Sequence, residues 1–125
     1  MAWISRDGHA SCEKALETIA GAAIAGLAPA LRAAGARLLT GGEPGGGNGA
    51  CYRNTLLCVT GDEFVAKAAA LQTEAFGNSS LLVIASHAAQ LPEIAAAMEG
   101  NLTGTIYSAN DGRDDQVYER VAPLL

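Results

Sequence analysis

The chain has 125 residues, of which 50% are hydrophobic and 5% aromatic, and its formal net charge is −5. This composition predicts one compact globular domain over residues 1–125 and excludes a disordered chain. The eight Lys and Arg residues are spread singly along the sequence, so the positive surface that binds phosphate backbones is missing and nucleic acid is excluded as a partner.

The first predicted element is a helix over residues 13–34, where apolar residues recur at spacings of three and four. Pro29 removes a backbone donor within this run, so we expect a kink or two shorter helices. Gly35 should end the element, and Ala36–Thr40 is predicted to be a strand. The glycine-rich residues 41–49 form a surface connector in this interpretation, because no Lys-Ser or Lys-Thr follows them and the next element is a strand.

The second half of the chain alternates strands and helices. Thr55–Val59 is apolar at nearly every position, as in a strand covered on both faces. Thr60 and Glu63 have the spacing of a capping box at the start of a helix over Asp62–Gln72. The remaining predicted elements are a strand over Leu81–Ala85, a helix from Pro92 to Gly100, a strand over Thr103–Ser108 and a last helix capped by Asn110 or Asp111. This order predicts an α/β fold with a mostly parallel sheet flanked by helices.

The turn Glu74-Ala75-Phe76-Gly77 connects a predicted helix to a predicted strand and is the best functional candidate. A carboxylate can accept hydrogen bonds from two ribose hydroxyls, an aromatic ring offers a face to a planar heterocycle, and glycine lets the backbone bend. The same residues also fit an ordinary helix end with an exposed Glu, a buried Phe and a terminal Gly. Both interpretations stay open on these four residues.

Cysteine and histidine residues supply the second set of candidates. Cys12 stands at a predicted helix start, three residues after His9, which would suit a thiolate nucleophile, although no third residue orients the histidine. Cys58 lies within an apolar strand and is predicted to be an inert core thiol, and Cys51 to be partly exposed. The odd cysteine number and the lack of paired CxxC spacing predict neither a disulfide framework nor a metal site.

Three further features affect function or location. Thr103, Thr105 and Tyr107 alternate along a predicted strand, so their hydroxyls either line a cleft or belong to an ordinary half-exposed strand. His87 is predicted to be a surface residue. The sequence has no apolar run of the roughly 20 residues that span a bilayer, and its start lacks a basic stretch followed by an apolar one, so a cytoplasmic location is expected.

Several segments, in this order, resemble the late part of the catalytic domain of the aldehyde dehydrogenase superfamily. They are Ala34–Gly42, Cys51–Leu57 and Thr73–Gly77. Downstream, Glu99–Tyr107 is most similar to the branch that oxidises α-ketoglutaric semialdehyde (2,5-dioxopentanoate). The resemblance extends from about residue 15 to the last residue and implies that the fold is part of an aldehyde dehydrogenase catalytic domain.

The resemblance implies a cofactor role for the Glu74 turn. Glu74 would hold the nicotinamide ribose through its hydroxyls, and Phe76 would contact the nicotinamide side of NAD or NADP; the choice between these two cofactors stays open. The family usually has proline at the positions of Asn54 and Asn78. Both replacements are expected to free a backbone that proline would fix.

The resemblance also implies missing parts. The family's nucleophile lies in a Gly-Gln-x-Cys type segment upstream of the matched part, and its general base and Rossmann glycines lie further upstream. None of Cys12, Cys51 or Cys58 matches that nucleophile. We therefore expect a fragment of an NAD(P)-dependent semialdehyde dehydrogenase that has no catalytic residue, no activity alone and no bound cofactor. In the parent enzyme the partners would be a small aldehyde, the nicotinamide cofactor and further copies of the chain.

Two alternatives to this interpretation remain. The first is a self-standing α/β interaction module that binds a partner chain through an exposed sheet edge or face. The second is a small thiol enzyme that uses Cys12 and His9.

Overall fold

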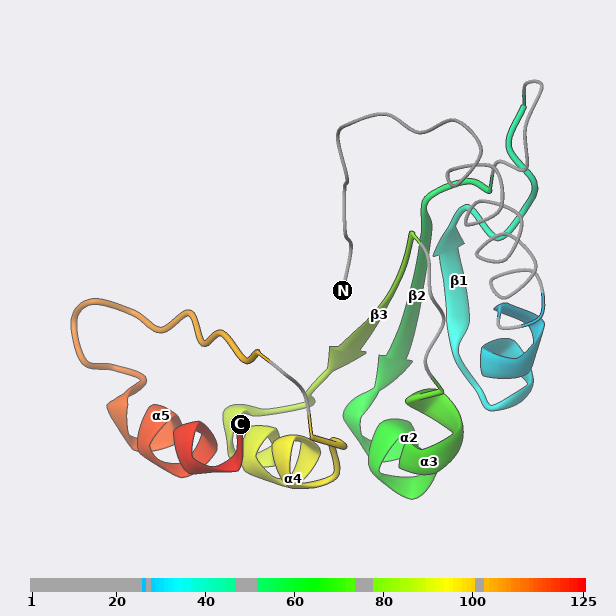
Figure 1. The fold of residues 1–125 in the computed structure, drawn as a ribbon. Coiled ribbons are helices and arrows are strands. Elements are labelled where there is room, and N and C mark those ends of the chain that lie inside the picture. Colours follow the sequence, from blue (N-terminus) through cyan, green and yellow to red (C-terminus); the bar gives the residue numbers. More distant parts are fainter. Residues whose placement is uncertain (1–25, 27, 47–51, 74–77, 101–102) are drawn as a thin grey trace. The chain divides into compact units, whose positions relative to one another are not determined.

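The computed structural model describes residues 26, 28–46, 52–73, 78–100 and 103–125. These residues form an α/β structure (Figure 1). Its strands are β1 (Arg37–Thr40), β2 (Thr55–Thr60) and β3 (Ser79–Ile84), which form one sheet in the order β1-β2-β3. The α/β class predicted from the sequence is therefore confirmed.

The sheet is mixed, which corrects the expectation of a mostly parallel one. β1 is antiparallel to β2, with Arg37 opposite Cys58 and a register shift between Leu38 and Thr40, whereas the arrows of β2 and β3 point the same way in Figure 1. The described part of the β1–β2 connection is the glycine-rich loop and contains no helix. Because a loop can join antiparallel strands but parallel strands need a crossover, this connection decides the orientation.

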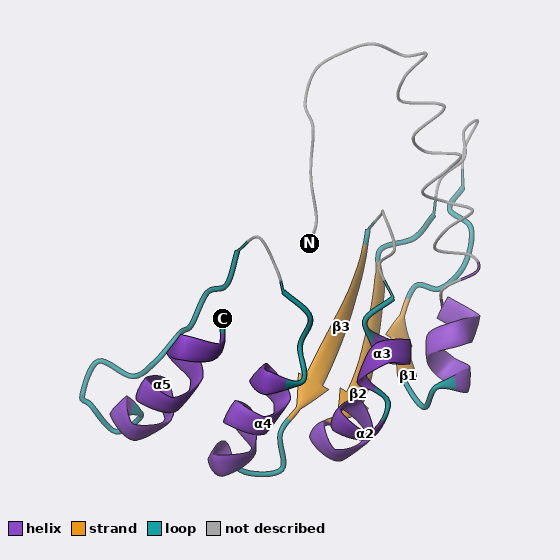
Figure 2. Ribbon diagram, turned by 60° about the horizontal axis from the view of Figure 1, so that its bottom comes forward, coloured by secondary structure: helices purple, strands orange, loops and turns teal. Residues whose placement is uncertain are grey.

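The predicted strand over Thr103–Ser108 is not a strand. Residues 103–109 pair with no described strand, and Figure 2 shows them as a loop that leads to the last helix. Alternating β-forming residues favour an extended backbone, but a strand also needs a neighbour with which to exchange hydrogen bonds. The sequence pattern therefore favoured a strand, but it could not show that no described strand lies beside this segment.

The chain divides into two compact units, which are described separately here. Unit 1 comprises Met1–Val59 and Thr73–Leu82, and unit 2 comprises Thr60–Gln72 and Val83–Leu125. Each has its own buried apolar residues. Those of unit 1 are Ala28, Leu31, Ala36, Leu57, Cys58 and Val59, and those of unit 2 are Phe64, Leu71, Ile94 and Ala95.

A helix over residues 28–33 precedes β1 in unit 1 and ends where the sequence predicted. Gly35 has a φ of 116°, its N–H donates to the carbonyl of Arg32 over 3.0 Å, and the N–H of Ala36 donates to the carbonyl of Leu31 over 2.8 Å. This pair of bonds is a Schellman motif, and both Leu31 and Ala36 are buried. The part of the predicted helix before residue 26 lies outside the described residues.

Unit 2 is built from short helices. They are α2 (Gly61–Ala66), α3 (Ala68–Leu71), the 3-10 helix η1 (Ala88–Gln90), α4 (Leu91–Ala96), α5 (Asp115–Val121) and the 3-10 helix η2 (Ala122–Leu124). α4 contacts both α2 and α5. Phe64 of α2, Leu71 of α3 and Ile94 of α4 are 2%, 3% and 5% exposed, so these three helices carry the large buried apolar side chains of the described part of this unit.

The predicted capping box at α2 is confirmed. The N–H of Glu63 donates to the Thr60 hydroxyl oxygen over 3.3 Å, and the N–H of Thr60 donates to the Glu63 carboxylate over 3.4 Å. The predicted helix Asp62–Gln72 is interrupted, however, because Lys67 has a non-helical φ of −133° and separates α2 from α3.

The two later helices are shorter than predicted. Pro92 lies in the first turn of α4 as expected, but α4 ends at Ala96 rather than at Gly100. α5 begins at Asp115, and neither Asn110 nor Asp111 caps it. The carboxylate of Asp114 accepts a hydrogen bond from the N–H of Ala109 over 2.9 Å and thereby holds the extended segment next to the start of α5.

Two glutamine side chains join α2 and α3 to the region of α4. Buried Gln90 donates through Nε2 to the carboxylate of Asp62 and accepts through Oε1 from the N–H and hydroxyl of Ser86. Gln72 donates to the carbonyl of Ala97 over 2.9 Å and accepts from the N–H of Glu99 over 2.7 Å. A carboxamide can do both because it carries a donor and an acceptor on one planar group.

Replacing Gln90 tests how much this link contributes. Gln90→Ala removes a buried acceptor from Ser86 and opens a void beside Gly61 and Ile94, so the free energy of unfolding should fall by about 1–3 kcal/mol. Urea denaturation followed by circular dichroism measures the change. Gln116→Ala on α5 is the matched control, with an expected effect within about 0.5 kcal/mol. Equal losses for the two variants would contradict a structural role of Gln90.

The capping box also makes a pH-dependent contribution. Hydrogen bonds from the Thr60 hydroxyl and backbone lower the pKa of Glu63. This contribution to stability is complete above the ordinary pKa of a glutamate and is lost as the pH falls through the lowered pKa of the folded state. Between about pH 6 and pH 3, the unfolding free energy of the unaltered chain should therefore fall more steeply than that of Thr60→Ala. Urea denaturation at a series of pH values would show parallel curves if the box had no such effect.

Candidate functional site

The predicted cofactor contacts Glu74 and Phe76 lie outside the described residues, together with the rest of the turn from residue 74 to residue 77. The structure does describe the residues that frame this turn in unit 1. They are Thr73 before it, Asn78 after it, and the start of β2.

Asn78, the residue after the turn, is held by its side chain and by its backbone. Its side-chain Nδ2 donates to the carbonyl of Tyr52 and to Oδ1 of Asn54, both over 2.8 Å. Its own carbonyl accepts from the N–H of Thr55 over 2.9 Å. Three hydrogen bonds thus connect the residue after the turn to residues 52–55, which lie at least 23 positions earlier in the chain.

The bond between Asn78 and Asn54 is a feature that the sequence did not predict. Both positions were expected to be freed by the loss of proline, yet in the structure each side chain is the other's partner. Proline limits a backbone through its ring and has no side-chain donor. An Asn–Asn pair instead holds two backbone segments together by a hydrogen bond. The sequence shows two asparagines 24 positions apart but does not show that their segments are neighbours. The pairing could therefore not be predicted from the sequence.

Thr55 connects the same region to the turn that follows β1. Its buried hydroxyl accepts from the N–H of Gly42 over 2.9 Å and donates to the carbonyl of Arg53 over 2.8 Å. Gly41 and Gly42 both have a φ of 75°, and a Cβ at Gly41 would collide with the backbone of Asn54. Glycine is therefore required there by both conformation and space.

The glycine-rich connector continues the antiparallel arrangement of β1 and β2. Pro44 forms an isolated bridge with Tyr52, and the N–H of Arg53 donates to the carbonyl of Glu43 over 3.0 Å. The exposed side chains of Arg53 and Glu43 also form an ion pair at 2.9 Å, of the kind that contributes little in water. The described part of the connector is thus the base of a hairpin, which agrees with the predicted surface connector.

The groups on this frame can orient a ligand or a backbone, because Asn54, Asn78 and Thr55 carry neutral donors and acceptors. None of these three side chains can act as an acid, a base or a nucleophile near neutral pH without a further activating group. The described frame is therefore suited to positioning and not to proton or group transfer.

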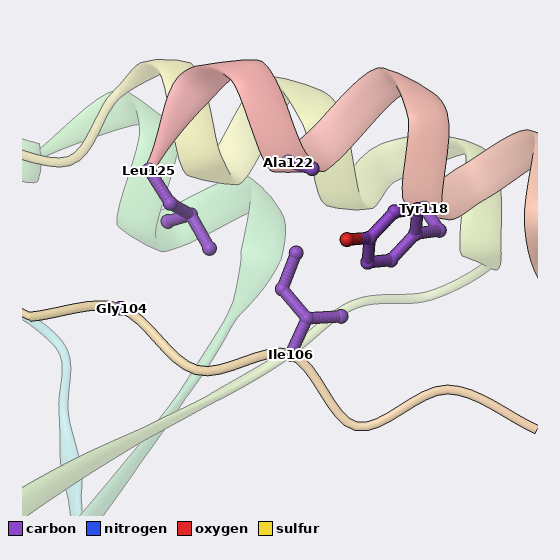
Figure 3. A pocket seen from close by; sticks show the side chains of 5 residues that line it. All are labelled: Gly104, Ile106, Tyr118, Ala122 and Leu125. Atoms are coloured by element: carbon purple, nitrogen blue, oxygen red, sulfur yellow. The ribbon is translucent and has the colours of Figure 1, made fainter.

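The predicted row of hydroxyls does not line a cleft. Thr103 and Thr105 are exposed, and Tyr107 is 96% exposed. The opposite side of the same segment contributes Gly104 and Ile106 to a pocket of about 310 Å³ whose other lining residues are Tyr118, Ala122 and Leu125. Figure 3 shows the side chains of Ile106, Tyr118 and Leu125 around this space. The residues that line the pocket, Gly104 and Ile106, are those that the sequence placed opposite the hydroxyl groups.

The cysteine and histidine candidates are only partly described. Cys58 is a free thiol, 8% exposed, as predicted for a core cysteine. Cys12, His9 and Cys51 lie outside the described residues. His87 is exposed, as predicted, and caps no helix with its side chain. Within the described ranges, no three His, Cys, Asp or Glu residues are grouped as a metal site requires.

Comparisons with known proteins add no relative: no protein-family model and no curated protein matches the sequence.

The helices of the described ranges are all too short or too polar to span a bilayer.

The Asn78 anchor can be tested with two isosteric changes. Asn78→Asp replaces a donor by an acceptor that faces the Tyr52 carbonyl and Asn54 Oδ1, so unfolding should become easier by about 1–3 kcal/mol. Asn54→Asp keeps the acceptor that Asn78 needs and should cost less than about 0.5 kcal/mol. Urea denaturation compares the two. The same loss for both variants would mean that the direction of the hydrogen bond is unimportant.

Proposed function

We propose that this chain carries the nicotinamide-ribose contact of an NAD(P)-dependent semialdehyde dehydrogenase and has no aldehyde-oxidising activity by itself. In this proposal Glu74 accepts hydrogen bonds from the ribose hydroxyls and Phe76 contacts the nicotinamide side of the cofactor. The substrate of the parent enzyme is a semialdehyde, with α-ketoglutaric semialdehyde as the first choice, and its location is cytoplasmic.

The structural observation that supports this proposal is the anchoring of Asn78. A carboxylate that must meet two hydroxyl groups has to be held within a fraction of an ångström of its position. The residue that follows the turn is tied to residues 52–55 by three hydrogen bonds. The chain therefore has a fixed attachment point next to the residues proposed to hold the ribose.

The inactivity of the chain follows from the chemistry that the parent reaction needs. Aldehyde oxidation of this type uses a cysteine thiolate to form a thiohemiacetal, hydride transfer to the bound nicotinamide and hydrolysis of a thioester. The only described cysteine, Cys58, is buried in the core of unit 1, and the sequence context of Cys12 and Cys51 differs from that of the family's nucleophile. We therefore assign no catalytic residue.

A second candidate function is an interaction module that binds a partner chain. One observation favours it: β3 is an edge strand of the sheet formed by the described residues, and its Leu82 side chain is 45% exposed. An open edge with exposed apolar side chains can add a strand from another chain. In that case the protein would associate without any affinity for nucleotides.

Titration with nicotinamide mononucleotide, which contains the ribose in question without the adenine half, tests the proposal. We expect weak, millimolar binding that shifts the amide NMR signals of Thr73 and Asn78, and loss of these shifts in Glu74→Ala. Glu93→Ala on α4 is the control and should leave the shifts unchanged. If the mononucleotide shifts the same signals in Glu74→Ala as in the unaltered chain, Glu74 does not bind the ribose.

Two further readouts separate the candidate functions. Incubation with α-ketoglutaric semialdehyde and NAD or NADP should give no reduced cofactor, and sustained turnover would contradict the proposed inactivity. Analytical ultracentrifugation measures self-association. The interaction module would be favoured if the chain forms stable oligomers that dissociate in Leu82→Lys and if the mononucleotide causes no change in the NMR signals.

A further inference from the structure

The loop that leads into α5 contains an Asp-Gly pair in an accessible position. The Asp111 side chain is 57% exposed, and Gly112 is exposed with a φ of 78°. Glycine has no side chain that could hinder its own backbone nitrogen from approaching the preceding carboxyl group. We propose that Asp111–Gly112 is a site of spontaneous aspartate isomerisation, and that Arg113 holds the rate of this modification down.

The reaction needs no enzyme and no co-reactant except water. The backbone nitrogen of Gly112 attacks Cγ of Asp111, a C–N bond forms, and one carboxyl oxygen leaves as water to give a five-membered succinimide. Water then opens this ring at either carbonyl. Opening at one carbonyl restores aspartate, and opening at the other gives isoaspartate, in which the chain continues through the side-chain carbon.

Arg113 binds the carboxylate that must react. Its Nε donates to Oδ1 and Oδ2 of Asp111 over 2.9 and 3.0 Å, and its Nη2 donates to Oδ2 over 2.6 Å. The backbone N–H of Arg113 also donates to Oδ1 over 3.3 Å. These four hydrogen bonds engage both carboxylate oxygens and restrict rotation of the carboxyl group about its bond to Cβ.

The same contacts act on the charge of the group. Hydrogen bonds from Arg113 lower the pKa of Asp111. A carboxylate anion is a poor electrophile and loses its oxygen only after protonation, so a lower pKa leaves less of the reactive form at neutral pH. Each unit of pKa changes the protonated fraction in this range about tenfold. Geometry and charge therefore both slow the reaction.

Isomerisation would change the structure around α5. It would insert an extra backbone carbon at residue 111, between Ala109 and Asp114, whose hydrogen bond holds the extended segment to the start of the helix. It would also shift the carbonyl of Gly112, which accepts from the N–H of Asp115 over 3.2 Å. The modification therefore affects the approach to α5 and not only an exposed loop.

Ageing the folded chain in water enriched in oxygen-18 tests the proposal. Each passage through the succinimide exchanges one carboxyl oxygen with solvent, so the peptide that contains Asp111 gains the mass of the heavy isotope even when aspartate is restored. Peptide mapping separates the isoaspartate form. We expect the label and the isoaspartate at Asp111, and both several-fold faster in Arg113→Ala than in the unaltered chain.

Three comparisons make the result specific to Arg113. Arg120→Ala removes an exposed arginine of α5 and should leave the rate unchanged. Arg113→Lys retains the positive charge without the two-sided contact and should give an intermediate rate. A synthetic peptide of residues 107–116, which lacks the fold, gives the unrestrained rate.

The outcomes decide the two parts of the proposal. Equal rates in the unaltered chain, Arg113→Ala and the peptide would overturn the protective role of Arg113. Absence of label at Asp111 in Arg113→Ala, when the peptide is labelled, would overturn the assignment of the folded protein's Asp111–Gly112 as a modification site. Unchanged circular dichroism of the variants excludes unfolding as the cause of faster reaction.

Discussion

Three side-chain carboxamides, those of Gln72, Asn78 and Gln90, connect segments of this protein that are far apart in the sequence. Their bonds link residues separated by 25, 26 and 28 positions, respectively. Among the described residues, Phe64 is the one aromatic side chain in the buried core, and three of the other buried apolar residues are alanines. Where alanine and glycine occupy so much of the chain, little apolar area is available. Hydrogen bonds between side chains then add to the connections that apolar contacts make.

Two glycines lie where a larger residue would collide with its neighbours, one of them with a carboxamide. Gly61 lies against the side chains of Gln90 and Ile94, and Gly41 lies against the backbone of Asn54. Each glycine permits the close approach that a short hydrogen-bonded connection requires. In unit 1 this arrangement holds Asn78 next to the turn for which we propose a cofactor contact. The proposal therefore rests on a frame made of neutral hydrogen-bonding groups and on the chemistry of Glu74 and Phe76.

The sequence predicted those features that depend on a few neighbouring residues. The capping box of Thr60 and Glu63 and the helix end at Gly35 each need only local spacing, and both are confirmed. The apolar strand β2 was also predicted within one residue. Cys58, which lies on that strand, was predicted to be buried and is.

Features that depend on distant partners could not be predicted in the same way. Residues 103–108 have the alternation of a strand, but no described strand lies beside them. The orientation of β1 depends on its connection to β2 rather than on its own residues. Asn54 and Asn78 indicated a loosened backbone when each was considered alone, and their pairing became visible only when residues 24 positions apart were placed together. For the candidate site, the residue types could be read from the sequence, whereas the hydrogen bonds of Asn78 became known only from the structure.

The bonds that Asn78 makes join neutral groups, whereas Gln90 donates to the carboxylate of Asp62, and this difference determines how salt and urea act on the links. Salt screens charges, and none of the bonds made by Asn78 involves an ionised group. Urea is itself a carboxamide-like molecule that solvates amide groups as well as apolar surface, and it competes directly for such bonds. The connection at Asn78 should therefore tolerate changes in ionic strength and weaken in urea, the opposite of a surface ion pair.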